Sequence, residues 1–203
     1  MADKKQSFFT IPNIISLARV AMIPLFAWAF LTGYEITALV IIIISGVSDK
    51  LDGTIARKYN MVSETGKWLD PLADKLTQMT LAVIMFIKFY TSDSAMMRFT
   101  AWVFIGFIVK EVLMLLFALA MLLMKKRPIA AEIWGKVATV VFYIVMGIFV
   151  LAGPDVGILA KYINWELPPV IVMILVVANL ILMVIAFLSY IPDTYRKIVK
   201  GEE

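Results

Sequence analysis

The chain has 203 residues, of which 62% are hydrophobic and 17% charged, whereas a soluble domain is usually about 45–50% apolar and about 25% charged. One water-soluble core could not bury this excess, so the composition excludes a soluble enzyme and predicts an integral membrane protein. Cysteine and histidine are absent, which excludes disulfides, thiolate or imidazole metal ligands and a cysteine nucleophile. Acid–base or metal chemistry must therefore come from the 15 Asp and Glu residues. The net charge of +4 is small, so the positions of the charged residues along the chain are more informative than its value.

Six stretches are predicted to be membrane-spanning helices, because a helix needs about 20 apolar residues to cross a bilayer. They cover residues 13–32, 35–57, 67–90, 97–124, 133–152 and 167–191. Short polar or Gly/Pro-containing segments separate them, and we find no soluble domain or internal repeat. We expect an all-α integral membrane protein with six transmembrane helices and a short N-terminal amphipathic segment, forming one domain over residues 1–203.

Cationic residues gather on one side of this predicted topology, at Lys4, Lys5, Arg57, Lys58, Lys67, Lys125, Lys126, Arg127, Arg196, Lys197 and Lys200. The opposite side has Lys88, Arg98 and Lys161. The positive-inside rule then puts both termini in the cytoplasm. We expect a multi-pass protein of the cytoplasmic membrane whose functional site faces the cytoplasm.

The first predicted helix has one polar face, since Asn13, Ser16 and Arg19 follow one another at intervals of three residues. Pro12 suits the start of a helix. Two interpretations fit this pattern: a capped helix lying partly in the membrane interface, or a helix that turns its polar face toward a ligand.

The second and third predicted helices carry two pairs of aspartates at the ends that face each other in sequence. Asp49 and Asp52 are i, i+3 neighbours, and Asp70 and Asp74 are i, i+4 neighbours, so each pair shares a helix face. The short connection makes the two helices antiparallel neighbours, which lets the pairs face one another. Four carboxylates at a membrane boundary repel unless they are protonated, paired with cations or bound to metal.

A metal is the interpretation that gives these four acids a chemical role. An all-oxygen ligand set favours Mg²⁺ or Mn²⁺, and four carboxylates suffice for two ions that clamp a phosphoryl group. Small residues at Gly53, Ala56 and Gly66 would leave room for a ligand beside the acids, and Arg57 could meet a phosphate. Taken alone, each of these four residues is better explained by close helix packing or by the positive-inside rule.

Together they form the pattern Asp-x2-Asp-Gly-x2-Ala-Arg-x8-Gly-x3-Asp-x3-Asp over residues 49–74. This pattern resembles the signature of the CDP-alcohol phosphotransferase (phosphatidyltransferase) family, which displaces CMP from a CDP-linked donor with an alcohol. The resemblance implies two Mg²⁺ or Mn²⁺ ions on Asp49, Asp52, Asp70 and Asp74, with Asp74 also as the general base. It also implies a binding site for the CDP-linked donor at Asn13, Asp52, Gly53, Ala56, Arg57, Ser63 and Gly66.

The segments 11–19 and 69–75, together with Trp134-Gly135-Lys136, are most similar to phosphatidylglycerophosphate synthases and their cardiolipin-synthase relatives. The resemblance therefore implies CDP-diacylglycerol as donor and glycerol 3-phosphate as acceptor, with Arg19, Lys110, Arg127 and Lys136 as candidate acceptor-binding cations. Lys110 and Glu111 lie inside the fourth predicted helix, where a self-neutralising pair is the alternative interpretation.

The sequence departs from the glycerol-phosphate enzymes at Lys110, where they usually have arginine, and at Ala138, where a second lysine is typical. These losses favour phosphatidylglycerol as acceptor, which would make the chain a cardiolipin synthase. A more remote alternative is an ion transporter that uses the acids as an ion path, although transport favours acids near the membrane midplane. We also expect a homodimer in the lipid bilayer and no nucleic-acid partner.

Overall fold

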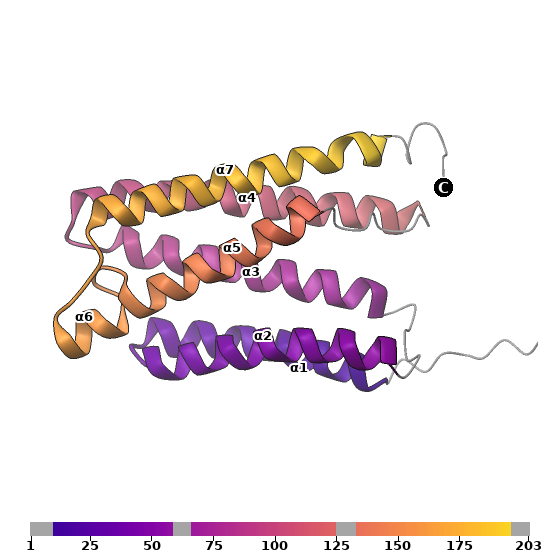
Figure 1. Ribbon diagram of the computed structural model, residues 1–203, viewed down its shortest axis with the longest axis horizontal. Helices are drawn as coiled ribbons and strands as arrows, with labels where there is room; N and C mark the ends of the chain where they lie inside the picture. The colour runs from indigo at the N-terminus through magenta and orange to yellow at the C-terminus, as the bar shows by residue number, and fades with distance from the viewer. Residues whose placement is uncertain (1–9, 59–65, 125–132, 196–203) are drawn as a thin grey trace, which may run out of the picture. The chain divides into compact units, whose positions relative to one another are not determined.

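The computed structural model describes residues 10–58, 66–124 and 133–195. Within these ranges the chain is helical and contains no strand (Figure 1). The helices are α1 (Ile11–Leu31), α2 (Glu35–Lys58), α3 (Gly66–Tyr90), α4 (Ala95–Leu123), α5 (Ile133–Ala152), α6 (Ile158–Ile163) and α7 (Pro169–Tyr195). The predicted N-terminal segment before residue 10 lies outside the described residues, as do Ser63 and Arg127.

Each of the six predicted stretches contains one long helix, so the expected all-α class is confirmed. The short helix α6 was not predicted. It follows Gly157 and ends at Asn164, whose φ of 53° is left-handed, and its few residues are too short a stretch for hydrophobic periodicity to reveal.

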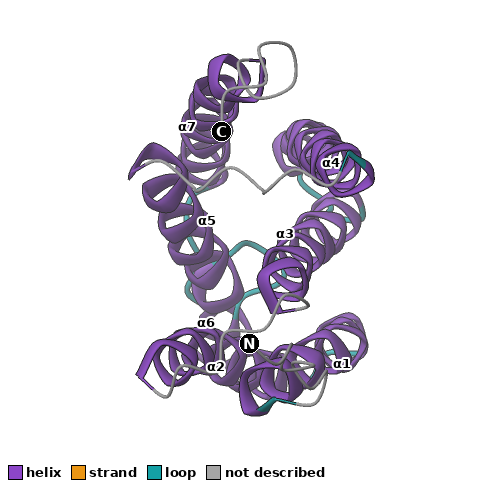
Figure 2. Cartoon of the chain, turned by 90° about the vertical axis from the view of Figure 1, so that its right-hand side faces the viewer, coloured by secondary structure: helices purple, strands orange, loops and turns teal. Residues whose placement is uncertain are grey.

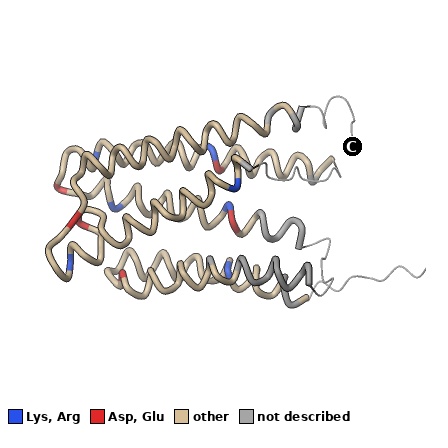
Figure 3. Tube along the Cα trace, in the orientation of Figure 1, with Lys and Arg blue, Asp and Glu red and all other residues tan. Residues whose placement is uncertain are grey.

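Four helices of the described chain are long and apolar enough to cross a membrane, at Asn13–Leu31, Ala95–Met121, Trp134–Ala152 and Pro169–Tyr190. In α2 the residues from Ile36 to Ser48 carry no charge, and Asp49, Lys50 and Asp52 follow them. Similarly, α3 begins with a segment that contains Lys67, Asp70 and Asp74. Figure 3 shows how few charged residues interrupt the rest of the described helices.

The chain divides into two compact units, and the first covers Met1–Leu81. Here α1 and α2 lie side by side as a helical hairpin (Figures 1 and 2). Gly33 makes the turn possible with a φ of 85°, a value that glycine adopts at little cost. Trp28 and Tyr34 stack across the turn with ring centroids 5.5 Å apart, while Phe26 and Phe30 are buried.

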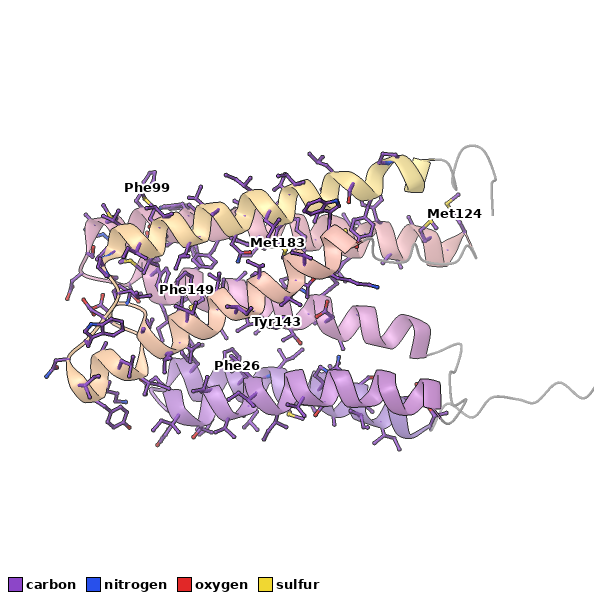
Figure 4. All side chains as sticks on the ribbon, viewed as in Figure 1. Phe26, Phe99, Met124, Tyr143, Phe149 and Met183 are labelled. Carbon is purple, nitrogen blue, oxygen red and sulfur yellow. The ribbon has the colours of Figure 1, made fainter. Side chains whose placement is uncertain are left out.

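The second unit covers Ala82–Glu203, and in it α7 packs against both α4 and α5. Its core is aromatic: Phe89 contacts Phe104 and Phe149 with ring centroids 5.6 and 5.7 Å apart. Phe107 and Phe142 continue the cluster, and Figure 4 labels Phe149 among the side chains that fill this unit. These rings give the unit an apolar, aromatic interior.

The loops at one end of the second unit are joined by polar contacts. The Ser92 hydroxyl donates to Asp155 Oδ2 at 2.5 Å, and Arg98 Nη1 donates to the carbonyl oxygens of Ser92 and Asp93. Asp155 has a left-handed φ of 61°. The connection between α3 and α4 is thereby tied to the connection between α5 and α6.

Candidate active site

The polar face of α1 is turned inward. Asn13, Ser16 and Arg19 are 4%, 0% and 3% exposed, whereas Ile14 and Leu17 on the other side are each 52% exposed. A helix lying in the membrane interface would direct its polar residues to water and its apolar residues to lipid. The burial pattern therefore argues against an interfacial helix, and the ligand-facing role of these residues stays a prediction.

Helix α1 starts where the sequence predicts. Thr10 is the N-cap, and its hydroxyl oxygen accepts a hydrogen bond from the backbone N–H of Asn13 at 3.4 Å. Pro12 lies in the first turn, where backbone N–H groups have no acceptor within the helix, so the N–H that proline lacks costs no hydrogen bond. The cap fixes where the helix begins and hence the positions of the three polar residues along it.

The acidic signature lies on regular helix. Asp49, Asp52, Gly53, Ala56 and Arg57 are in α2, and Gly66, Asp70 and Asp74 are in the first part of α3. The predicted i, i+3 and i, i+4 relationships therefore hold along the backbone, and each acidic pair falls on one helix face. All of these residues belong to the unit Met1–Leu81.

Of the four signature acids, Asp74 is the one whose side chain the structure describes. The described side chains form no cluster of three or more candidate ligands, so the two-metal site stays a prediction. Its support is the donor set: four carboxylates offer hard oxygen ligands suited to Mg²⁺ or Mn²⁺, and the helices place them in two pairs.

Asp74 has a partner that sequence reasoning missed. Gln78, one turn later on α3, donates from Nε2 to Asp74 Oδ2 at 2.8 Å. Asp74 is half-buried, whereas Gln78 is fully buried at 0% exposure. The signal was present in the sequence as an amide four residues after the acid, a spacing at which Gln and Asp side chains bond on a helix.

Lys110 and Glu111 form the buried pair that the sequence suggested as an alternative to acceptor binding. Lys110 Nζ contacts Glu111 Oε1, and the two side chains are 8% and 1% exposed. Met183 Sδ on α7 lies 4.0 Å from Lys110 Nζ, and Figure 4 labels Met183 between the helices. Asn179, a further buried polar residue of α7, is 2% exposed and was not predicted.

Lys136 lies in the first turn of α5 and is exposed, whereas Ala138 is buried at 1% exposure. Lys110 and Lys136 belong to the unit Ala82–Glu203, whereas Arg19 belongs to the unit Met1–Leu81. The exposed Lys136 at the start of α5 can therefore bind an anion that arrives from water, whereas a lysine in place of Ala138 would be buried.

Comparison with known proteins assigns the family. The sequence model for the CDP-alcohol phosphatidyltransferase family matches residues 9–191. A CDP-diacylglycerol–glycerol-3-phosphate 3-phosphatidyltransferase of Aquifex aeolicus is 27% identical over 191 residues, which is 94% of this chain and 98% of the relative. The Bacillus subtilis protein of the same name is 36% identical over 96 residues, 40% of this chain and 49% of the relative.

A cardiolipin synthase (CMP-forming) of Streptomyces coelicolor is 48% identical over 73 residues, 33% of this chain. The alignment covers 34% of that relative, so the chain spans about a third of its length. The family match, by contrast, extends over nearly the whole chain and includes the two helices that carry the acidic pairs. The protein is therefore a member of the CDP-alcohol phosphatidyltransferase family.

Proposed function

We propose that this protein transfers a phosphatidyl group from CDP-diacylglycerol to glycerol 3-phosphate and releases CMP. The observation that carries the proposal is the gapless eight-position signature on α2 and α3, within a chain that the family model matches over residues 9–191. The choice of acceptor is supported by the Aquifex aeolicus relative, which aligns over 94% of this chain and bears that activity in its name.

The donor pyrophosphate would be held at the acidic signature. Asp49, Asp52, Asp70 and Asp74 would bind two Mg²⁺ or Mn²⁺ ions, which supply charge neutralisation for the pyrophosphate and for the departing CMP. The rest of the donor would be bound by Asn13, Asp52, Gly53, Ala56, Arg57, Ser63 and Gly66. The burial of Asn13, at 4% exposure, is consistent with an inward-facing role.

Asp74 would act as the general base. An alcohol is a weak nucleophile, so a carboxylate within hydrogen-bond reach must take its proton as it attacks. The acceptor oxygen then bonds to the phosphorus that carries the diacylglycerol. The bond from that phosphorus to the bridging oxygen breaks, and CMP leaves with the electron pair.

The acceptor phosphate would be met by cations among Arg19, Lys110, Arg127 and Lys136. Arg19 is 3% exposed and shares the inward face with Asn13, and Lys136 is exposed at the start of α5. A water-soluble dianion such as glycerol 3-phosphate requires such cations, which makes them the part of the proposal that mutation tests most directly.

Cardiolipin synthesis from phosphatidylglycerol is the second candidate. Two observations favour it. The first is the 48% identity to the Streptomyces coelicolor cardiolipin synthase over 73 residues. The second is the ion pair between Lys110 and Glu111, which reduces the positive charge that could hold the phosphate of glycerol 3-phosphate. A lipid acceptor needs fewer cations and a lateral apolar approach.

Purified protein with CDP-diacylglycerol and each acceptor in turn separates the two candidates. We expect a lipid with the mass of phosphatidylglycerophosphate from glycerol 3-phosphate, and an acceptor KM that rises in Lys136→Ala while donor binding is kept. Cardiolipin as the sole product would replace the first candidate with the second. If neither acceptor releases CMP, the transferase proposal fails.

We further propose that the chain acts as one domain with six membrane spans in the cytoplasmic membrane, with both termini and the active site on the cytoplasmic side. The asymmetric distribution of Lys and Arg supports this orientation. A homodimer is proposed from the family resemblance. Crosslinking in native membranes should recover a dimer, and recovery of monomer alone would contradict it.

A further inference from the structure

Gln78 is a fully buried polar side chain placed one helical turn beyond Asp74. Its Nε2 lies 2.8 Å from Asp74 Oδ2, and its exposure is 0%. A carboxylate can only accept hydrogen bonds, so the NH₂ group of the amide must be the end that faces Asp74. The contact is a charge-assisted hydrogen bond, which is stronger than one between neutral groups.

Packing alone does not explain an amide at this position. Gln78 Oε1 is buried and has no hydrogen-bond partner within the described part of the chain. A buried polar atom without a partner costs free energy, and methionine, which has a similar shape, would fill the same space without that cost. Leu81, Ala82 and Met85, which lie three, four and seven residues further along α3, are apolar and buried. What glutamine adds is the N–H group aimed at Asp74.

We propose that Gln78 is a positioning residue for the general base of the transfer reaction, an inference that rests on the proposed function. The hydrogen bond holds the Asp74 carboxylate in one orientation on the helix. The base must meet the acceptor hydroxyl while the acceptor oxygen bonds to the donor phosphorus and CMP departs with the electron pair of the broken P–O bond. A carboxylate held in place meets this geometry more often than one that rotates.

Kinetics of CMP release test this role, with Gln78→Met as the central variant. It keeps the length and apolar body of the side chain and removes the donor. We expect kcat to fall about 10- to 100-fold, because a misplaced catalytic group costs about 10²-fold in rate. The KM values for CDP-diacylglycerol and for the acceptor should stay within about twofold, because an interaction that matters only in the transition state changes kcat and not binding.

Two further variants separate positioning from structure. Thr77→Val is the matched control, because the Thr77 hydroxyl donates to the carbonyl oxygen of Ala73 at 2.8 Å on the same helix and not to Asp74; it should keep wild-type kcat. Gln78→His places an N–H donor at the same distance along the side chain and should recover most of the rate, whereas the isosteric Gln78→Glu should not. This pair also keeps the test decisive if Gln78→Met fails to fold.

The Asp74→Glu background gives an independent readout. The longer Glu side chain moves the carboxylate away from Gln78 Nε2, so the hydrogen bond is already lost in this background. Adding Gln78→Met there should change kcat less than about threefold, a non-additive result expected of two residues acting as a unit. A kcat within twofold of wild type in folded Gln78→Met overturns the inference, as does an equal loss in Thr77→Val or full additivity with Asp74→Glu. Activity in Asp74→Asn would instead refute the proposed base, which distinguishes the two failures.

Discussion

The hydroxyl oxygen of Tyr190 on α7 lies 2.1 Å from the position that a Cβ atom on Gly135 would occupy. Gly135 is in the first turn of α5, directly before Lys136. Any larger residue at 135 would have to push the Tyr190 ring away, since the Cζ atom of that ring is also only 3.0 Å from the same position. A side chain at 135 therefore fits only if the Tyr190 ring of α7 shifts.

Gly135→Ala should lower the free energy of unfolding by about 1–3 kcal/mol, the usual cost of overpacking. Adding Tyr190→Phe removes the 2.1 Å contact and leaves the one at 3.0 Å, so it should restore part of the loss, and Tyr190→Ala should restore more of the steric part. Thermal midpoints in detergent measure this series.

Gly147→Ala is the matched control on the same helix, because nothing lies within 4 Å of a Cβ atom there. We expect it to be neutral or slightly stabilising. Equal destabilisation by both alanine variants would show that α5 tolerates no alanine for reasons other than Tyr190.

Lys110→Met should destabilise the protein by about 3–5 kcal/mol, because it leaves the Glu111 carboxylate buried without its cation. The double variant Lys110→Met/Glu111→Leu removes both charges and should recover most of that stability. Lys161→Met, at an exposed position of α6, serves as the control and should cost much less, since an exposed ion pair contributes about 1 kcal/mol at most. A thermal midpoint of Lys110→Met equal to wild type would contradict the buried pair.

The same double variant distinguishes the two roles of Lys110. If Lys110 only neutralises Glu111, the double variant regains activity together with stability. If Lys110 binds the acceptor phosphate, the double variant is stable but its KM for glycerol 3-phosphate rises about tenfold or more, the effect of losing about 1.4 kcal/mol of binding. Acceptor titrations of CMP release give the answer.

Removal of divalent metal should abolish CMP release, because the proposed ligands are hard oxygens that bind Mg²⁺ or Mn²⁺. Excess EDTA stops the reaction, and added Mg²⁺ or Mn²⁺ restores it. Asp49→Asn, Asp52→Asn and Asp70→Asn should each lose activity together with metal binding, measured by calorimetry. Asp93→Asn, an exposed acid in the other unit, should retain both. Full turnover in chelator would refute the metal site.

Asp155 combines a left-handed φ of 61° with a hydrogen bond from Ser92. Asp155→Asn keeps an acceptor oxygen and tolerates this backbone conformation, so its stability should match wild type. Asp155→Ala loses both advantages and should cost about 1–3 kcal/mol, whereas Asp155→Gly relieves the backbone alone and should fall between the two. Thermal midpoints rank the three, and any other order would contradict the account.

The long helices could be predicted from the sequence because apolar runs of membrane length are an unambiguous signal. The inward face of α1 was open to two interpretations, since the spacing of Asn13, Ser16 and Arg19 defines a face but not its surroundings. The observed burial of those residues counts against the interfacial helix, whereas the ligand-facing role stays a prediction. The acidic pairs were predictable because i, i+3 and i, i+4 spacing fixes a shared face on any regular helix.

Other contacts depend on which helices meet, and that information is absent from periodicity. The fit of Tyr190 against Gly135 and the burial of Asn179 on α7 arise from packing between helices distant in sequence. Gln78 differs, because its partner Asp74 is one turn away, and the i, i+4 rule could have identified the pair. The helix α6 is too short to leave a periodic signal.

The limited apolar length of α2 has a consequence for how a lipid substrate reaches the signature. At 1.5 Å per residue, the uncharged residues 36–48 extend about 20 Å, roughly two thirds of a hydrocarbon layer about 30 Å thick. Beyond this stretch the helix carries Asp49, Lys50 and Asp52. If α2 spans the membrane as we propose, these residues need water beside them within the boundary of the bilayer. A two-tailed lipid could then keep its acyl chains among neighbouring lipids while its headgroup is already in water, and reaction would require only sideways diffusion, without extraction of the lipid from its leaflet.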